Sequence, residues 1–333
     1  MQYFTRKQFW LLGLIALLCV SAGFVVGYYS HITPSNSYMG IREQDTSYKF
    51  IHPLLAINRI DMSIPAPVYV PLLNKIKDFI ASQKKVGSLD SASVYFVNYG
   101  QKTGSFALNE KEAYAPASML KVVVMVAYLK KADSDPSILG TNLTYNPNVA
   151  EELQSIPFES PSTLVFGRSY TVESLIRSMI IDSDNGAMNL LISNIDPNYL
   201  NMVYRNLGLQ VPSDNSLYMI SAEDYSLFLR VLYNGTYLSD KNSEKALSIL
   251  SQATYYDGLV AGVPSGTVVA HKYGEHVVGS GDQVTSVELH DCGFVYPAKD
   301  PYLLCVMTRG KNLAGLTETI SGISKLVYGS VVQ

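Results

Sequence analysis

Charged residues are scarce in this chain. Asp, Glu, Lys and Arg make up 16% of its 333 residues, while 47% are hydrophobic. Basic residues are not in excess either, since 25 Lys and Arg stand against 28 Asp and Glu. A nucleic-acid-binding protein would carry clustered basic residues, and a disordered chain would combine low hydrophobicity with high net charge. The composition therefore excludes both classes and predicts a folded chain without a nucleic-acid partner.

Cysteine and histidine are rare as well, with three Cys and five His in the chain. The histidines form no H-E-x-x-H motif, and His271 and His276 are poorly spaced for chelation across a glycine-containing strand end. We expect no metal site and no cofactor. The length is enough to bury a core without help from either metals or disulfides.

Two of the cysteines, Cys292 and Cys305, lie in apolar runs separated by residues 297–301, a pattern typical of a hairpin. Near-opposite positions would allow a disulfide. The register cannot be derived from the sequence, however, and two buried thiols that never pair are the more common outcome. Cys19 follows the bulky Leu18, which argues against lipidation.

One long hydrophobic run stands at the N-terminus. Residues 9–28 contain no acid, base or imidazole, and a helix of that length can cross about 30 Å of hydrocarbon. Because Arg6 and Lys7 precede the run and no charge follows directly, we expect a cytoplasmic N-terminus and an extracytoplasmic body. The alternative is a signal peptide cleaved near residues 20–22. Apolar residues continue through 24–26, which favours an uncleaved, single-pass anchor in the cell membrane.

The sequence suggests three segments. Residues 1–29 form the cytoplasmic tip and transmembrane signal anchor, residues 30–65 an extracytoplasmic stalk or linker, and residues 66–333 a folded domain. Residues 50–55 are too apolar for a plain linker, so we expect them to dock on the domain.

Hydrophobic periodicity within the domain predicts helices and strands in separate blocks. Helices are expected at 70–82, 118–131, 171–181, 221–233 and 313–328, and strands at 93–99, 105–108, 266–271, 283–289, 291–296 and 302–308. This order is not the alternation of a Rossmann fold. It predicts an α/β protein of the α+β type, in which an antiparallel sheet is flanked by N- and C-terminal helices and carries an inserted all-helical lobe.

A candidate nucleophile lies at the start of the second predicted helix. Ser118 and Lys121 are one turn apart, so their side chains lie on the same face. Lys121 stands near a helix N-terminus among valines, and both desolvation and the helix end lower the pKa of an amine there. A neutral amine could accept the proton of Ser118 and activate its hydroxyl. The pair alone is weak evidence, since a capping Ser and a surface Lys have the same spacing.

Two further motifs follow in the chain, Ser183-Asp184-Asn185 and Lys272-Tyr273-Gly274. With Ser118-x-x-Lys121, they resemble the markers S-x-x-K, S-D-N and K-T-G of the class A β-lactamases and penicillin-binding proteins, in the same order. The resemblance covers about residues 66–333. It implies a β-lactamase- or transpeptidase-like fold with the active site between the sheet and the helical lobe.

The resemblance also implies roles for individual residues. Ser118 would be the acylated nucleophile, Lys121 its activating partner, and Ser183 the proton relay to the leaving nitrogen. Lys272 would supply positive potential over the site. The backbone N–H groups of Ser118 and Glu275 would form the oxyanion hole.

Four residues are implied as substrate-binding: Asn185, Tyr273, Gly274 and Glu275. Asn185 would bind the acyl side-chain amide of the substrate. Asp184 would fix its loop through backbone hydrogen bonds rather than take part in catalysis.

The third motif departs from the family pattern. Tyr273 replaces the Thr or Ser whose hydroxyl binds the substrate carboxylate in the family, and a phenol cannot occupy the same place. Glu275 adds a negative charge beside this anion site, unless it points away or pairs with His271, His276 or Arg309. We expect either weaker carboxylate binding or a contact of Tyr273 with another part of the ligand.

A second departure concerns deacylation. Class A β-lactamases place a glutamate on a loop between the second and third motifs, where it activates water. In this chain Glu223 is explained by helix capping and Glu244 lies in a polar turn, while residues 207–219 contain no glutamate. Deacylation of a β-lactam is therefore predicted to be slow.

Together these observations predict a membrane-anchored serine hydrolase of the β-lactamase or D-alanyl-D-alanine peptidase class. Its substrate would be a β-lactam or a cell-wall peptide ending in D-Ala-D-Ala. The alternative is a non-catalytic cell-wall-binding module that retains the fold. The oligomeric state and the physiological acyl donor stay open.

Overall fold

The computed structural model describes residues 49–51, 62, 64–100, 103–146, 162–213, 217–278 and 285–332, all within the unit Gln44–Gln333. The predicted anchor at residues 9–28 and most of the predicted stalk at 30–65 lie outside these residues. Within the described ranges, no helix combines the length and apolar character needed to cross a membrane. The anchor, the stalk and the domain boundaries therefore stay predictions.

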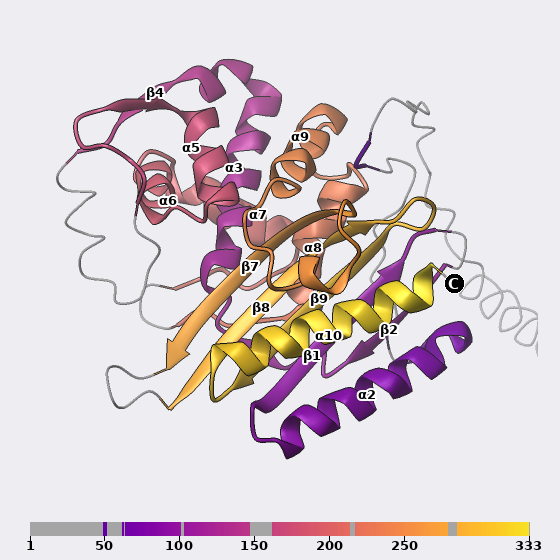
Figure 1. Ribbon diagram of the computed structural model, residues 1–333. Coiled ribbons are helices and arrows are strands. Elements are labelled where there is room, and N and C mark those ends of the chain that lie inside the picture. The colour runs from indigo at the N-terminus through magenta and orange to yellow at the C-terminus, as the bar shows by residue number, and fades with distance from the viewer. Residues whose placement is uncertain are drawn as a thin grey trace, which may run out of the picture. The chain divides into compact units, whose positions relative to one another are not determined.

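An antiparallel sheet of five strands organises the described unit (Figure 1), in the order β2-β1-β9-β8-β7. Its strands are β1 (Leu89–Asn98), β2 (Gly104–Leu108), β7 (Val268–Val278), β8 (Ser286–Tyr296) and β9 (Tyr302–Gly310). The inner strands β8 and β9 are buried along almost their whole length, because helices cover both faces of the sheet. Strand β7 forms one edge, which leaves it open to a ligand.

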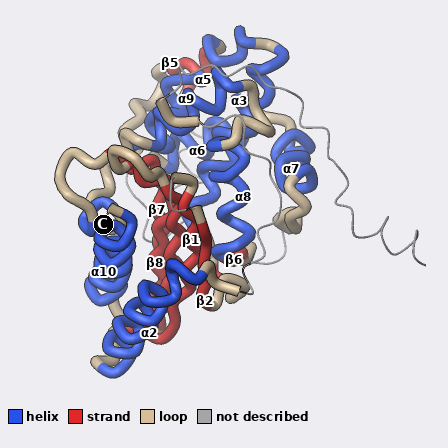
Figure 2. Tube along the Cα trace, turned by 90° about the vertical axis from the view of Figure 1, so that its right-hand side faces the viewer, coloured by secondary structure: helices blue, strands red, loops and turns tan. Residues whose placement is uncertain are grey.

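Two helices, α2 (Val70–Lys85) and α10 (Leu313–Val331), cover one face of the sheet (Figure 2). Their apolar stripes, which include Ile76 and Ile320, pack on Phe96 of β1 in a single buried cluster. The side chain of Asn312 caps α10 by accepting a hydrogen bond from the Gly315 N–H at 2.9 Å. These are the predicted N- and C-terminal flanking helices.

The other helices form the lobe on the opposite face (Figures 1 and 2). They are α3 (Lys121–Ser134), α5 (Val172–Ile181), α6 (Asn185–Ile192), α7 (Pro197–Asn206), α8 (Ala222–Tyr233) and α9 (Asp240–Leu250). Helices α5 to α9 each begin at a residue whose side-chain oxygen accepts a backbone N–H, namely Thr171, Asp184, Asp196, Ser221 and Ser239. The predicted α+β fold with an inserted helical lobe is confirmed.

Shorter elements connect the sheet and the lobe. Strand β3 (Ala113–Tyr114) pairs with β6 (Ile220–Ser221), and β4 (Asn142–Thr144) pairs with β5 (Ser169–Thr171). Short 3-10 helices occur at η1 (Pro67–Tyr69), η2 (Ala117–Leu120), η3 (Pro136–Gly140) and η4 (Val260–Gly262). The β3–β6 pair ties the segment before η2 to the start of α8.

Several predicted boundaries were wrong. The helix predicted at 118–131 begins as η2 and becomes α-helical only from Lys121. The strand predicted at 266–271 runs on to Val278, and the two strands predicted on either side of His290 are one strand, β8. Glu244 lies in helix α9 rather than in a polar turn. Strands β7 and β8 continue through polar residues such as His271 and Asp291, whose buried side chains are 2.8 Å apart and pair with each other.

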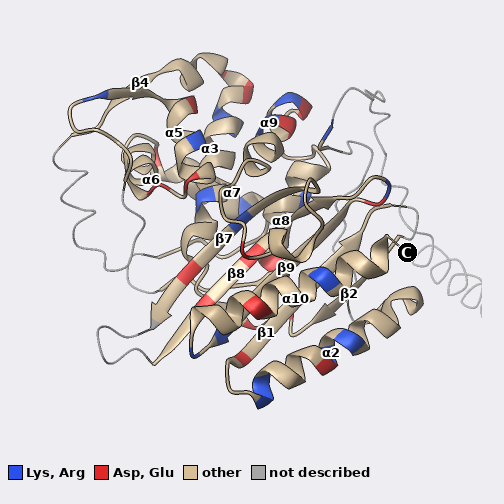
Figure 3. Ribbon diagram, viewed as in Figure 1, with Lys and Arg blue, Asp and Glu red and all other residues tan. Residues whose placement is uncertain are grey.

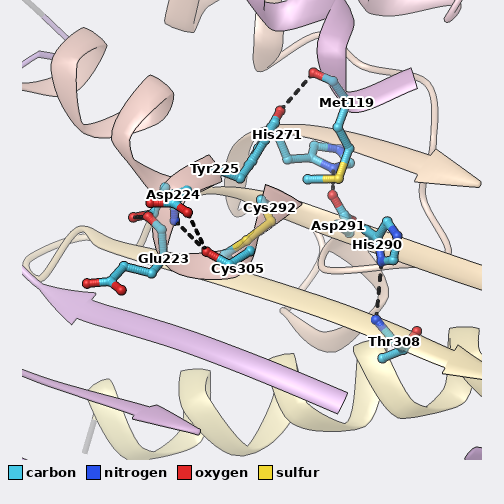
Figure 4. The surroundings of a disulfide bond; sticks show 12 residues. Met119, Glu223, Asp224, Tyr225, His271, His290, Asp291, Cys292, Cys305 and Thr308 are labelled. Atoms are coloured by element: carbon cyan, nitrogen blue, oxygen red, sulfur yellow. Dashed lines mark hydrogen bonds and ion pairs between the residues drawn. A yellow bond between two sulfur atoms is a disulfide. The ribbon is translucent and has the colours of Figure 1, made fainter. Parts of the chain in front are cut away.

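The cysteine pair forms a disulfide, contrary to the expectation of two unpaired thiols. Cys292 on β8 is directly opposite Cys305 on β9 in the register, and the two sulfur atoms are bonded (Figure 4). The hairpin turn sets this register, and with it the pairing. The bond lies in the buried layer between the sheet and α8.

Candidate active site

Ser118 lies in η2, directly before the buried helix α3. The preceding residue, Ala117, has a φ of 48°, in the left-handed region that residues with a side chain rarely adopt. This strained turn places the Ser118 hydroxyl at the start of α3. There the Lys121 Nζ lies 2.7 Å from the Ser118 Oγ.

Lys121 is fully buried and is the centre of a hydrogen-bond cluster. Its Nζ lies 2.7 Å from the Ser183 carbonyl oxygen and 3.0 Å from the Ser183 Oγ, and it also contacts the Asn185 Oδ1. With the Ser118 Oγ, four oxygens surround an ammonium that has only three donors. The cluster therefore also suits a neutral amine, whose lone pair can accept the Ser118 proton.

The loop of the second motif is held in a fixed conformation. Ser183 has a φ of 57°, and Asp184 caps α6 by accepting the Ala187 N–H at 2.9 Å. The other carboxylate oxygen of Asp184 accepts hydrogen bonds from the Thr163 N–H at 2.6 Å and hydroxyl at 2.8 Å. Both oxygens of Asp184 thus serve the loop, which agrees with the structural role expected for it. Asn185 opens α6 and turns its amide oxygen to Lys121.

Lys272 of β7 approaches Ser183 from the sheet. Its Nζ donates a hydrogen bond to the Ser183 Oγ at 3.0 Å, so this hydroxyl lies between the Nζ atoms of Lys121 and Lys272. Burial lowers the pKa of Lys272 well below its ordinary value, the charge of Lys121 lowers it further, and Asp291 partly opposes both effects. The four predicted catalytic residues are thus brought together, although they come from η2, α3, the α5–α6 loop and β7.

Gly274 lets β7 pack closely against the turn that carries Ser118. A Cβ atom at this position would lie 2.3 Å from the Pro116 carbonyl oxygen and 3.1 Å from the Met119 nitrogen. Any side chain would therefore push the strand away from η2. This close approach holds β7 against η2, the turn that carries Ser118.

Tyr273 turns away from Ser118, because successive side chains of a strand alternate between its faces. Its ring stacks on that of Tyr255, with centroids 4.0 Å apart and planes inclined by 18°. The Lys272 Nζ lies over the same ring, 4.3 Å from its centroid. The Tyr273 side chain is therefore part of an aromatic stack that packs against the buried cluster of α2, α10 and the sheet.

The Glu275 side chain is exposed to solvent. Nearby protein atoms still desolvate its carboxyl in part, which raises the pKa of that group. Two of the suggested partners are engaged elsewhere. The His271 Nδ1 lies 2.8 Å from Asp291, and the Arg309 Nε lies 2.6 Å from Glu288. Neither residue therefore neutralises Glu275.

A family model described as the beta-lactamase enzyme family matches residues 71–331 of the chain. The chain belongs to this family. The match includes all three motifs, so the resemblance that they indicated is confirmed. The sheet and the helical lobe are those of the beta-lactamase-like serine hydrolase fold.

Solved structures with the same fold include both penicillin-binding proteins and β-lactamases. PBP-A is 23% identical, with a TM-score of 0.65 over 78% of this chain and 96% of that one. A β-lactamase from Sphaerobacter thermophilus is 20% identical, with a TM-score of 0.64 over 78% and 97%. The TLA-3 extended-spectrum β-lactamase is 18% identical, with a TM-score of 0.65 over 78% and 100%. No match is found among curated proteins.

A buried carboxylate that the motifs do not include holds the segment before the nucleophile. Glu288 of β8 accepts a hydrogen bond from the Ala115 N–H at 2.8 Å and one from the Arg309 Nε at 2.6 Å. Burial by itself raises the pKa of Glu288, but the hydrogen bonds from His290, Ala115 and Arg309 outweigh it and lower the pKa to about 2. In this family member the Ser118 turn is thus tied to the sheet by a buried ionised group.

His290 belongs to the same network, rather than to a strand end as the sequence suggested. Its Nδ1 accepts the Thr308 N–H at 3.2 Å (Figure 4). The proton of a neutral ring is therefore on Nε2, which faces the Ala115 carbonyl at 3.1 Å. Glu288 and His290 were visible in the sequence as polar residues within an otherwise apolar stretch. Their role was missed because the stretch was interpreted as two strands, at 283–289 and 291–296, instead of the single buried strand β8.

The two glutamates considered for deacylation, Glu223 and Glu244, both have structural roles away from the three motifs. Glu244 accepts the N–H groups of Lys49 and Phe50 at 3.0 and 2.8 Å. Phe50 and Ile51 are buried, which agrees with docking of the start of the 50–55 segment. Glu223 lies in the first turn of α8, as expected. Residues 214–216 of the predicted glutamate-free loop lie outside the described part of the chain.

Proposed function

We propose that this chain is an acyl-transferring serine hydrolase that forms an acyl-enzyme at Ser118. The observation that carries the proposal is the 2.7 Å contact between the Lys121 Nζ and the Ser118 Oγ inside a buried cluster. A serine hydroxyl is a weak nucleophile until a base removes its proton, and a buried amine at this distance can do so.

The contacts support a complete acylation sequence. The Ser118 Oγ attacks the acyl carbonyl carbon and its proton passes to Lys121, while the backbone N–H groups of Ser118 and Glu275 bind the oxyanion. The bond from carbon to the leaving nitrogen then breaks. That nitrogen takes a proton from the Ser183 Oγ, which regains one from the Lys121 Nζ at 3.0 Å. Attack by water on the acyl-enzyme ester releases the acid and restores Ser118.

We propose further that deacylation of a β-lactam is slow. Glu244 is occupied by the backbone of residues 49 and 50, and Glu223 lies at a helix start beside its cap. Neither position supports activation of water at the Ser118 ester. The expected result is an acyl-enzyme that persists, as in penicillin-binding proteins.

The substrate class and location are part of the same proposal. We propose a β-lactam or a D-Ala-D-Ala-type cell-wall peptide as the acyl donor, met outside the cytoplasm by a domain anchored through residues 9–28. A variant of PBP-A, 23% identical to this chain, was solved as an acyl-enzyme complex with penicillin G. The hydrophobic run and the charges before it support the anchor.

The test is adduct formation on the full chain in detergent, measured by intact mass. Two donors are used, a fluorescent penicillin at millimolar concentration and an uncharged N-acyl-D-alanyl thioester. We expect a Ser118 adduct that is absent in Ser118→Ala, and Ser174→Ala serves as an exposed serine control. If neither donor labels the wild type, the chain is not an acyl-enzyme, and the non-catalytic binding module becomes the better description. Loss of the penicillin adduct within seconds would contradict slow deacylation.

A further inference from the structure

We propose that one end of the α2–α10 helix pair docks on a lipid bilayer surface rich in acidic phospholipid. Apolar side chains at this end would enter the outer hydrocarbon, and two lysines would lie at the level of the headgroups. This surface is separate from the three motifs, and the inference does not depend on the proposed acyl-enzyme chemistry.

A groove of about 540 Å³ runs between the two helices. It is lined from the start of α2 and the end of α10, so the N-terminus of α2 lies beside the C-terminus of α10. The apolar part of the lining is made by Val68, Pro71, Leu72, Phe79 and Leu326. The groove can therefore take an apolar chain, such as the acyl chain of a lipid.

Four exposed apolar residues form a tip at this end of the helix pair. They are Ile64, Val68, Val70 and Val332, which are between 38% and 77% exposed. Ser330 lines the groove together with Val68, so the end of α10 and its C-cap Val332 lie beside η1. A contiguous exposed apolar patch indicates a binding surface, and apolar area that enters a bilayer leaves water.

Two lysines of the groove lie at a suitable depth behind the apolar tip. Lys75 and Lys325 line the groove from opposite sides. Lys75 follows Val68 by seven residues, or about 10 Å along a helix. Interfacial helices bury their apolar side about 5–10 Å into the boundary between headgroups and acyl chains. With the tip at that depth, both ammonium groups would meet the headgroups.

The charge of the helix pair suits acidic headgroups. Figure 3 shows lysines on both helices, which carry five lysines against Asp78 and Glu318, although the whole chain has a net charge of −3. In the described part of the chain, no ion pair engages Lys75 or Lys325. Acidic headgroups attract lysines near a membrane surface. A second copy docked face to face would instead bring like charges together, which disfavours a symmetric dimer.

This surface is small, so its affinity for a bilayer would be low by itself. The predicted anchor at residues 9–28 would keep the domain near a bilayer and raise the effective concentration of the surface there. Docking would then turn one fixed side of the domain toward the membrane.

Quenching of tryptophan emission by brominated lipid measures the contact. The single tryptophan of the full chain is removed by Trp10→Phe, and a new one is introduced by Val68→Trp. The protein is placed in nanodiscs of phosphatidylglycerol and dibrominated phosphatidylcholine in equal parts. Val86→Trp is the matched control, because Val86 caps the other end of α2 and is 74% exposed.

We expect bromination of the lipid to lower the Val68→Trp emission at least about twofold and to change the Val86→Trp emission little. No quenching at position 68, or equal quenching at both positions, would overturn the inference. A blue-shifted but unquenched emission at position 68 would indicate a protein surface, such as a second copy, and would overturn lipid docking as well.

Lysine variants test the preference for acidic lipid. Lys75→Gln with Lys325→Gln should remove at least about half of the quenching at position 68. Lys84→Gln with Lys85→Gln, at the other end of α2, should leave it unchanged; all four lysines are exposed, so the fold should persist. Quenching that is the same in both double variants would refute the role of charge. Penicillin labelling of Ser118 in the same samples reports on the proposed function separately.

Discussion

Replacement of Glu288 by Gln tests how the nucleophile's turn is held. In the wild type the Glu288 carboxylate accepts hydrogen bonds from the Ala115 N–H and the Arg309 Nε, at 2.8 and 2.6 Å. The amide of Gln offers only one acceptor oxygen, so its NH2 group must face one of these two donors. Glu288→Gln therefore leaves a buried donor unsatisfied and removes the charge that pairs with Arg309.

The size of the effect follows from the pKa of Glu288. Its fall from an ordinary 4.5 to about 2 corresponds to about 3 kcal/mol of unfolding free energy at neutral pH. Because the pKa is depressed in the folded state, this contribution is complete above pH 4.5 and is lost as the pH falls toward 2. We therefore expect Glu288→Gln to destabilise the protein by about 3 kcal/mol at pH 7 and by about half as much at pH 3.

Urea unfolding of the full chain, followed by circular dichroism at pH 7 and pH 3, measures this difference. Glu112→Gln is the matched control, because Glu112 pairs with the same Arg309 at 3.2 Å but is 30% exposed. Exposed pairs contribute about 0–1 kcal/mol, so the control should change little. A Glu288→Gln protein as stable as the Glu112→Gln protein, or a difference that does not depend on pH, would refute the reasoning.

Two further substitutions test the contacts of β7. Gly274→Ala should destabilise the protein by about 1–3 kcal/mol and slow acylation at least about tenfold, because the new Cβ would meet the Pro116 carbonyl oxygen. The control is Gly329→Ala, where nothing lies within 4 Å of the new Cβ. If Gly274→Ala were acylated as fast as the wild type, the close approach of β7 to η2 would not be needed for acylation. Lys272→Met should abolish acylation yet leave unfolding free energy unchanged or raise it by about 1–2 kcal/mol. Since the pKa of Lys272 is depressed, wild-type stability should rise toward pH 10.5 relative to Lys272→Met, and parallel pH profiles would contradict this.

Much of the fold could be predicted because its signals are local. The helices expected at 171–181 and 221–233 are present, and Thr171 and Ser221 act as their N-caps in the structure. The α+β arrangement followed from the block order of helices and strands. Boundaries failed where tertiary partners compensate for polar residues, as at His290 and Asp291 in β8.

The candidate site was predictable only as a set of residue types. The motifs named Ser118, Lys121, Ser183 and Lys272, because each has a fixed spacing in the chain. Ser183 lies between Lys121, which is 62 positions away in the chain, and Lys272, which is 89 positions away. No pattern in the sequence encodes such distances directly.

The sequence by itself determined the family, the fold class and the residue types of the proposed chemistry, since motifs and periodicity are short-range properties. The tertiary structure decided how distant segments meet. Strand register joined Cys292 to Cys305 and set Asp291 opposite Tyr273. Packing of the lobe on the sheet stacked Tyr255 on Tyr273 and tied Glu288 to Ala115. Such contacts set the desolvation and charge of the candidate site, because both depend on all the segments that surround it.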